Sequence, residues 1–156
     1  GLLLAHKASK EAKVAVDQIV GKDSDAKEAV IPSVVFTDPE VAWCGLTETE
    51  AKARNIAVEV SRFPWVALGR ALCVDRTDGV TKLILEPKTH RILGAGICGV
   101  GAGDLISEAV LAMKMGATAR DLAHTVHPHP TFSETLMECA QAFYGTSAHT
   151  FNRKRS

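Results

Sequence analysis

Two strand-like runs with a very short connection constrain the fold more than any other feature of this sequence. Residues 80–86 and 91–98 are rich in branched and other apolar residues, and Pro87-Lys88-Thr89-His90 joins them. So short a segment can link antiparallel strands, whereas parallel strands need a crossover of about a dozen residues or more. The sequence therefore predicts a β-hairpin, and with it an antiparallel sheet.

The rest of the chain supplies further short strands and a set of helices. Strands are predicted at 31–36, at 40–44 and at 56–63. Helices are predicted at 4–20, 47–55 and 104–115, in a short segment opened by Thr118, and in a last segment that starts near Phe132 and ends at Gly145. Residues 64–78 are expected to be irregular. This order predicts an α+β domain with an antiparallel β-sheet flanked by helices rather than a doubly wound parallel sheet.

Composition excludes several classes of function. The 156 residues hold 18 basic and 18 acidic side chains, which gives no basic footprint for nucleic acid. No apolar run approaches the roughly 20 residues that a membrane span needs, so no membrane partner is expected. The four cysteines are widely spaced and are expected to be reduced core residues of an intracellular protein: Cys44, Cys73, Cys98 and Cys139.

Two histidines on stiffened backbone mark the most unusual stretch, residues 127–134. His127 and His129 each precede a proline, which favours extended backbone at both positions. Thr131 and Glu134 have the spacing of a capping box at a helix start, which is a purely structural interpretation of Glu134. Rigidly held imidazoles also indicate a functional site, so both interpretations stand at this point.

Two other patterns are weaker alternatives. Residues 94–99 match G-x-G-x-x-G, with Asp121 further along, but no second parallel strand follows, so we favour glycines that allow close packing of the sheet. His124, His127 and His129 raise the alternative of a small metal-dependent enzyme. The intervening prolines limit how far these rings can converge, and we expect no metal site.

The stretch 127–134 resembles the active-site base segment of the dihydrolipoamide dehydrogenases, within the pyridine nucleotide-disulfide oxidoreductases. Residues 32–45 look like the opening of the C-terminal dimerisation domain of that family, and residues 4–8 look like the helix that ends its flavin domain. Residues 101–106 also fit. The resemblance implies a division into a terminal flavin-domain helix at 1–21, a linker at 22–30 and a dimerisation or interface domain at 31–156.

The resemblance also implies roles for individual residues. His129 would be the general acid/base that takes a proton from a thiol of dihydrolipoamide, and Glu134 would hold and polarise its ring, leaving Thr131 to cap the helix without it. Leu3, Leu4, Ala5 and His6 would face the flavin of FAD, and Pro130 would set His129 against the partner subunit's flavin. The full-length parent would be a homodimer that uses FAD and NAD and serves the lipoyl domain of 2-oxo acid dehydrogenase complexes.

Departures from the family pattern limit what this chain is expected to do alone. The closely spaced redox cysteines, the FAD fingerprint and the NAD domain of the family have no counterpart in the sequence. We therefore expect a C-terminal fragment that is inactive by itself, from a bacterial cytoplasm or a mitochondrial matrix. Alternatives are a glutathione-reductase-like relative, since those enzymes share the His-Pro-Thr-x-x-Glu core, and a homo-oligomerisation module without chemistry.

Overall fold

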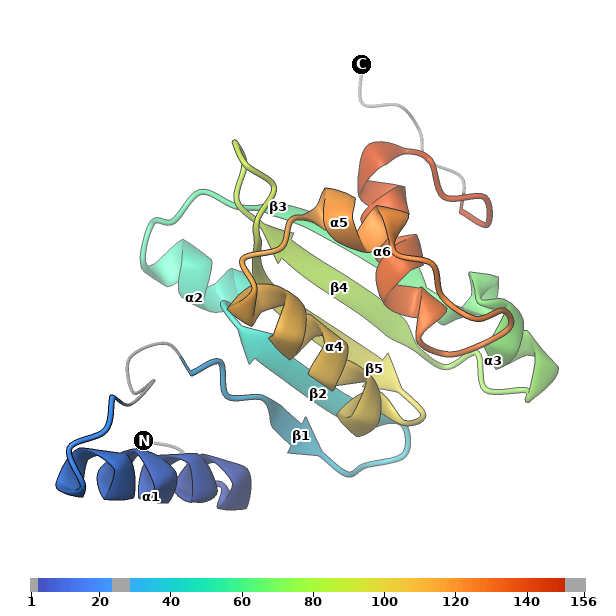
Figure 1. Ribbon diagram of the computed structural model, residues 1–156. Coiled ribbons are helices and arrows are strands. Elements are labelled where there is room, and N and C mark those ends of the chain that lie inside the picture. The colour runs from blue at the N-terminus through green and yellow to red at the C-terminus, as the bar shows by residue number, and fades with distance from the viewer. Residues whose placement is uncertain (1–2, 24–28, 151–156) are drawn as a thin grey trace.

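A single antiparallel sheet forms the centre of the protein. The computed structural model describes residues 3–23 and 29–150, and its five strands lie in the order β1-β2-β5-β4-β3 (Figure 1). In chain order the strands are β1 (Ser33–Val35), β2 (Glu40–Gly45), β3 (Glu59–Pro64), β4 (Val80–Leu85) and β5 (Ile92–Gly99). Each neighbouring pair is antiparallel, and β4 pairs with β5 as the hairpin that the sequence predicted. The predicted α+β class is confirmed.

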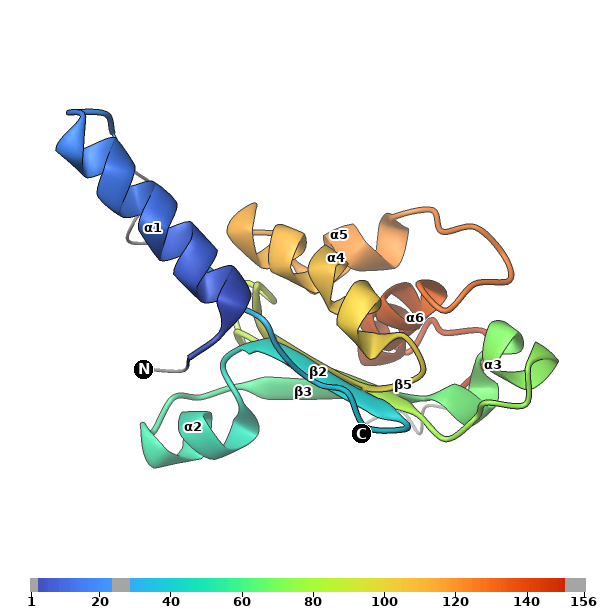
Figure 2. The ribbon, with the colours of Figure 1, turned by 90° about the horizontal axis from the view of Figure 1, so that it is seen from below.

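Helices divide between the two faces of this sheet. The longer helices α4 (Ala102–Lys114) and α6 (Glu134–Tyr144) lie with α5 (Ala119–His124) on one face, and α2 (Glu48–Ala53) lies on the other (Figure 2). The core fills the space between the sheet and α4, α5 and α6, and its largest fully buried side chains include Trp65, Phe63 and Leu83. The loop between α5 and α6, which carries residues 127–131, is thus held beside the most buried helices.

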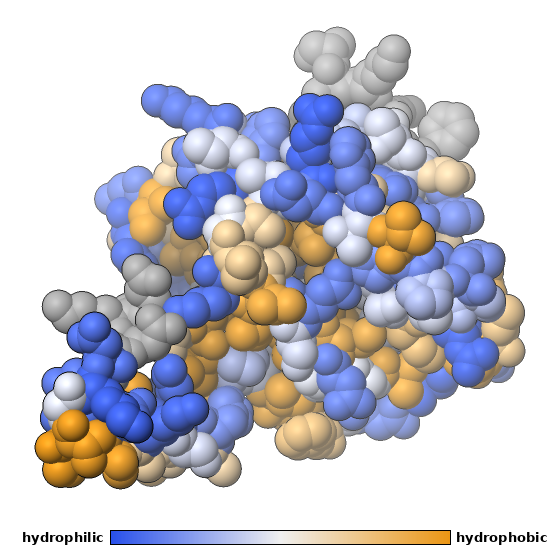
Figure 3. Space-filling view, viewed as in Figure 1, coloured by the Kyte–Doolittle hydropathy of each residue, from blue (hydrophilic) through white to orange (hydrophobic). Residues whose placement is uncertain are grey.

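Helix α1 (Ala5–Ile19) stands apart from this core. It has no buried residue, and it extends away from the sheet in two views (Figures 1 and 2). Apolar side chains gather at its far end (Figure 3), where Val16, Ile19 and Val20 are 57%, 83% and 58% exposed. Its amphipathic character was predicted, but within the described residues its apolar side faces no core.

The prediction of irregular structure at 64–78 was wrong for residues 65–73. A 3₁₀ turn (Trp65–Ala67) and the short helix α3 (Gly69–Cys73) occupy part of this segment. Trp65 and Ala71 are 0% exposed, and Leu68 is 2% exposed. These turns therefore owe their order to tertiary packing, which a search for local periodicity does not detect. The predicted linker at 22–30 falls largely on residues 24–28, which lie outside the described residues.

Gly94 and Gly99 in β5 serve close packing, as expected for glycines in this strand. The G-x-G-x-x-G pattern lies inside the strand rather than at a turn between a strand and a helix. A Cβ on Gly94 would lie 2.0 Å from the carbonyl oxygen of Leu46, and one on Gly99 would lie 2.4 Å from the ring of Trp65. These glycines leave space for a neighbouring loop and for the largest core side chain, and their positions give no support to a dinucleotide fingerprint.

All four cysteines are free, and the expectation that they lie in the core holds for two of them. Cys44 and Cys139 are buried, and burial raises the pKa of their thiols to about 11 and about 12. Cys98 is partly exposed, and Cys73 is exposed at the end of α3. The error at Cys73 follows from the missed helix, because Ala71 turns inward there while Cys73 faces solvent.

Gly94→Ala is expected to lower the free energy of unfolding by about 1–3 kcal/mol or more, because the new methyl group meets backbone that cannot move aside easily. Gly96→Ala is the matched control on the same strand, since its Cβ would come no closer than 4.0 Å to a neighbour. Urea denaturation of both variants measures the difference. Equal stability of the two variants would show that the close approach at Gly94 is not a packing constraint.

Thiol labelling is expected to follow burial. In the native protein at neutral pH, iodoacetamide should modify Cys73 readily and leave Cys44 and Cys139 unmodified, because the raised pKa of each buried thiol suppresses the reactive thiolate. Peptide mass spectrometry quantifies each site, and labelling in denaturant gives the control in which all become reactive. Rapid native labelling of Cys139 would contradict the burial described.

Candidate functional site

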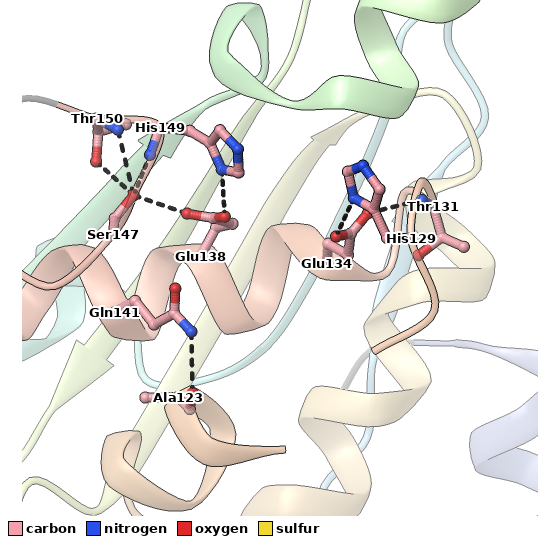
Figure 4. A network of polar contacts seen from close by, with 9 residues as sticks. All are labelled: Ala123, His129, Thr131, Glu134, Glu138, Gln141, Ser147, His149 and Thr150. Atoms are coloured by element: carbon pink, nitrogen blue, oxygen red, sulfur yellow. Dashed lines mark hydrogen bonds and ion pairs between the residues drawn. The ribbon is translucent and has the colours of Figure 1, made fainter. Parts of the chain in front are cut away.

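An imidazole and a carboxylate from the loop and helix predicted by the sequence meet in the structure. His129 Nδ1 lies 2.9 Å from Glu134 Oε1 (Figure 4). The His129 side chain is 66% exposed, whereas the Glu134 side chain is 8% exposed. The pair therefore combines a buried, fixed carboxylate with a ring that remains open to an incoming molecule.

Glu134 makes a second hydrogen bond that fixes its own orientation. Its Oε2 accepts from the backbone N–H of Thr131 at 2.7 Å. Helix α6 begins at Glu134, and no side chain caps it at Ser133. The Thr131 hydroxyl instead donates to the carbonyl oxygen of Pro128 at 2.7 Å. The predicted cap by Thr131 was therefore wrong. Glu134 can both bond the His129 ring and accept from the Thr131 backbone, because a different carboxylate oxygen makes each contact.

This geometry determines the protonation pattern of the His129 ring. An ionised carboxylate can only accept, so Nδ1 carries the hydrogen and donates to Glu134. When the ring is neutral, Nε2 then presents a lone pair, and the carboxylate stabilises the positive charge that follows proton uptake. The arrangement suits a general base with an orienting partner.

The first residue of α3 lies against the His129 ring. A Cβ on Gly69 would be 3.5 Å from Cε1 of His129 and 3.9 Å from Cβ of Pro130. The absence of a side chain at Gly69 therefore brings the backbone of α3 close to the imidazole. No pattern in the sequence pointed to this contact, because it joins segments that are far apart in the chain and include the missed helix.

The other two histidines of the metal alternative do not join His129. His127 bonds to Glu108 on α4, with its Nε2 2.8 Å from Oε1. His124 lies at the end of α5 and is exposed. Within residues 3–23 and 29–150, no group of three or more histidine, cysteine, aspartate or glutamate residues is arranged to hold a metal ion. The structure thus gives the metal alternative no support.

A second imidazole–carboxylate pair, which the sequence did not predict, involves Glu138 on α6. Glu138 is 3% exposed; it lies 2.6 Å from His149 Nδ1 and accepts from the Ser147 hydroxyl at 2.7 Å (Figure 4). These contacts hold the segment that follows α6 against the helix. Residues 151–156 lie outside the described residues. The one sequence feature that could have indicated this pair is the position of Glu138, one helical turn after Glu134.

The residues assigned to a flavin lie at the start of α1, apart from Pro130. Leu3 is fully exposed, and Leu4 precedes the helix without offering a side-chain cap. The first turn holds no acidic residue, so its N–H groups and positive helix end are compatible with an electron-rich ring edge. Ala5 is exposed, and His6 donates from Nε2 to the carbonyl oxygen of Pro32 at 2.7 Å. Pro130 directly follows His129 and is exposed.

Comparison with known proteins places these observations in a family. Residues 31–140 match the pyridine nucleotide-disulphide oxidoreductase dimerisation domain. The dihydrolipoyl dehydrogenase of Buchnera aphidicola from Schizaphis graminum is 47% identical over 99% of this chain and 32% of its own length. The chain thus spans about a third of the length of the curated relatives that it matches.

Solved structures share the fold. LpdA from Mycobacterium tuberculosis superposes with a TM-score of 0.85 at 24% identity, over 91% of this chain and 31% of its own, which shows the common fold alone. The HOCl-induced flavoprotein disulfide reductase RclA from Escherichia coli gives a TM-score of 0.82 at 28% identity, over 90% and 33%. In the described part of the chain, no helix has the length and apolar character of a membrane span.

Glu134→Gln is expected to reverse the tautomer of His129. The Thr131 N–H needs an acceptor, so the amide oxygen of the substituted side chain would face it and the amide NH₂ would face Nδ1, which must then accept. Nitrogen-15 NMR of the imidazoles, at a pH where the rings are neutral, should show hydrogen at Nδ1 in the parent chain and at Nε2 in the variant. His149 is the internal control, and an unchanged His129 tautomer would contradict the assigned geometry.

Proposed function

The chain belongs to the dimerisation-domain family of the pyridine nucleotide-disulphide oxidoreductases, and we propose that it is the interface domain of a dihydrolipoyl dehydrogenase. In this proposal it forms a homodimer and supplies His129 and Glu134 to the disulfide and flavin site of the partner subunit. The relatives named dihydrolipoyl dehydrogenase support the choice within the family, since they align with almost the whole chain.

One observation carries the proposal: a buried carboxylate holds Nδ1 of an exposed imidazole at 2.9 Å. A thiol is a weak nucleophile until it loses its proton, and a neutral imidazole with a free Nε2 can take that proton near neutral pH. Glu134 stabilises the resulting imidazolium and keeps the ring in the correct tautomer. The thiolate of dihydrolipoamide can then attack the disulfide contributed by the other subunit.

The proposal also assigns the flavin-facing residues and the domain boundaries. Residues 1–21 end the flavin domain, residues 22–30 are the linker, and residues 31–156 are the interface domain. FAD, when bound, would supply two-electron redox chemistry between the dithiol and NAD. Leu3, Leu4, Ala5 and His6 at the start of α1 would face the flavin, and Pro130 would set His129 against the flavin of the partner subunit. The exposed apolar end of α1 supports this division, because it requires a covering surface.

The whole parent enzyme would act on the lipoyl domains of 2-oxo acid dehydrogenase complexes, in a bacterial cytoplasm or a mitochondrial matrix. The chain by itself holds the base but not the family's closely spaced redox cysteines, so we expect it to be inactive in isolation. A homo-oligomerisation module without chemistry is the competing proposal. The effect of replacing His129 in the full-length enzyme distinguishes the two proposals.

In the full-length, flavin-loaded enzyme, His129→Gln is expected to lower the rate of flavin reduction by dihydrolipoamide by about 10²–10⁴-fold, because glutamine cannot accept the thiol proton. Reduction of the flavin by NADH should change little, since that half-reaction needs no thiol deprotonation. Stopped-flow absorbance measures both rates in the same preparation. His149→Gln is the matched control, and normal thiol oxidation by His129→Gln would remove the proposed role.

A further inference from the structure

His127 lies two residues before the proposed base, and the proposed reaction does not use it. Its side chain is 5% exposed, compared with 66% for His129. A ring so well covered cannot meet a substrate thiol without a rearrangement of the loop. The pairing of this buried imidazole with a carboxylate therefore calls for a different explanation.

Both ring nitrogens of His127 are already engaged. Nδ1 lies 3.0 Å from the carbonyl oxygen of Thr125, which can only accept, so Nδ1 carries hydrogen and donates. Nε2 lies 2.8 Å from Glu108 Oε1 and shares one proton with it, either as a donor to the carboxylate or as an acceptor from the protonated acid. In both cases no ring nitrogen remains for proton exchange with a substrate.

The partner of His127 belongs to a rigid element. Glu108 lies within α4, whose side chains Ile106 and Ala109 are 0% exposed against the sheet. The hydrogen bond to Glu108 therefore ties the loop between α5 and α6 to the core on one side of His129. On the other side, Glu134 ties the same loop to α6 through His129 and Thr131.

Little backbone freedom separates these two attachments. Pro128 and Pro130 have fixed φ angles, and the Thr131 hydroxyl bonds back to the carbonyl oxygen of Pro128. A change at residue 127 is therefore transmitted to residue 129 rather than absorbed between them. Small misplacements matter for a base, since about 1 Å at the reacting groups can cost about 10²-fold in rate.

We propose that His127 and Glu108 form a positioning clamp that fixes the loop to α4 and so keeps His129 aligned for proton transfer. The clamp acts through His129 and touches no reacting atom. This inference rests on the proposed function of His129 and deepens it, by naming two residues on which the placement of the base depends.

The test uses the full-length, flavin-loaded dimer and the two flavin half-reactions. His127→Leu and Glu108→Ala are expected to slow flavin reduction by dihydrolipoamide by about 10-fold to 100-fold with little change in KM. Glu108→Gln should stay within about twofold of the parent, because its amide can donate to Nε2 of a neutral His127 and so preserve the clamp. The NADH half-reaction should be unchanged in all three variants.

His149→Leu is the matched control, since it breaks an imidazole–glutamate pair of similar geometry outside the clamp. The pH dependence of the rate of flavin reduction distinguishes a positioning role of His127 from direct proton transfer by it. A misplaced His129 lowers the rate at every pH without shifting the pH profile. A displaced or lost ionisation in His127→Leu would overturn the proposal in favour of a direct role.

Two further outcomes keep this proposal distinct from the proposed function. If His129→Gln is inactive while His127→Leu and Glu108→Ala both reduce flavin at the parent rate, the clamp is wrong and the base assignment stands. If His129→Gln is fully active, the base assignment itself fails. If the His127→Leu enzyme loses its flavin, the Glu108→Ala enzyme tests the clamp instead. Glu108 is partly exposed, and its truncation removes the hydrogen bond without altering the loop sequence.

Discussion

The candidate site depends on one buried carboxylate, that of Glu134. It is 6% exposed as a residue, yet both of its oxygens are satisfied, one by His129 Nδ1 and the other by the N–H of Thr131. Its place at the first residue of α6 puts the negative charge at the positive end of the helix. These contacts offset the cost of burying a charge, so the imidazole is held by a fixed partner rather than by a mobile surface group.

The direction of that carboxylate is set in turn by how α6 is fastened to the sheet. The Trp65 indole donates to Thr81 Oγ1 at 3.0 Å, and Thr81 Oγ1 lies 2.5 Å from Thr135 Oγ1. Further along the helix, the Ser61 hydroxyl donates to the carbonyl oxygen of Cys139 at 2.7 Å. No buried side-chain nitrogen or oxygen lacks a partner in the described ranges. Such a satisfied network restricts rotation of α6, and thereby fixes where Glu134 points.

Sequence reasoning succeeded where the determining physics is local. The short hairpin connection predicted the pairing of β4 with β5. The helix predicted at 47–55 is present as α2, and a capping box of Thr47 and Glu50 opens it. The pairing of His129 with Glu134 also joins near neighbours. Spacing misled at Thr131, because the Pro128 carbonyl competes for its hydroxyl.

What the sequence missed depends on contacts between distant segments. Helix α3 is ordered by the burial of Trp65, Leu68 and Ala71, and the approach of Gly69 to His129 follows from it. Glu108 lies 19 residues from His127 and shares no recognisable spacing with it. The exposure of His129 beside a buried Glu134 required the complete fold as well. That asymmetry bears on the proposed function. The His129 ring, at 66% exposure, has its geometry set before any substrate arrives, but it lies in water, where its bond to Glu134 is weakened. A second surface that covers the ring would lower the local dielectric and strengthen the bond, so the arrangement suits a base that is completed by another subunit better than one that works alone.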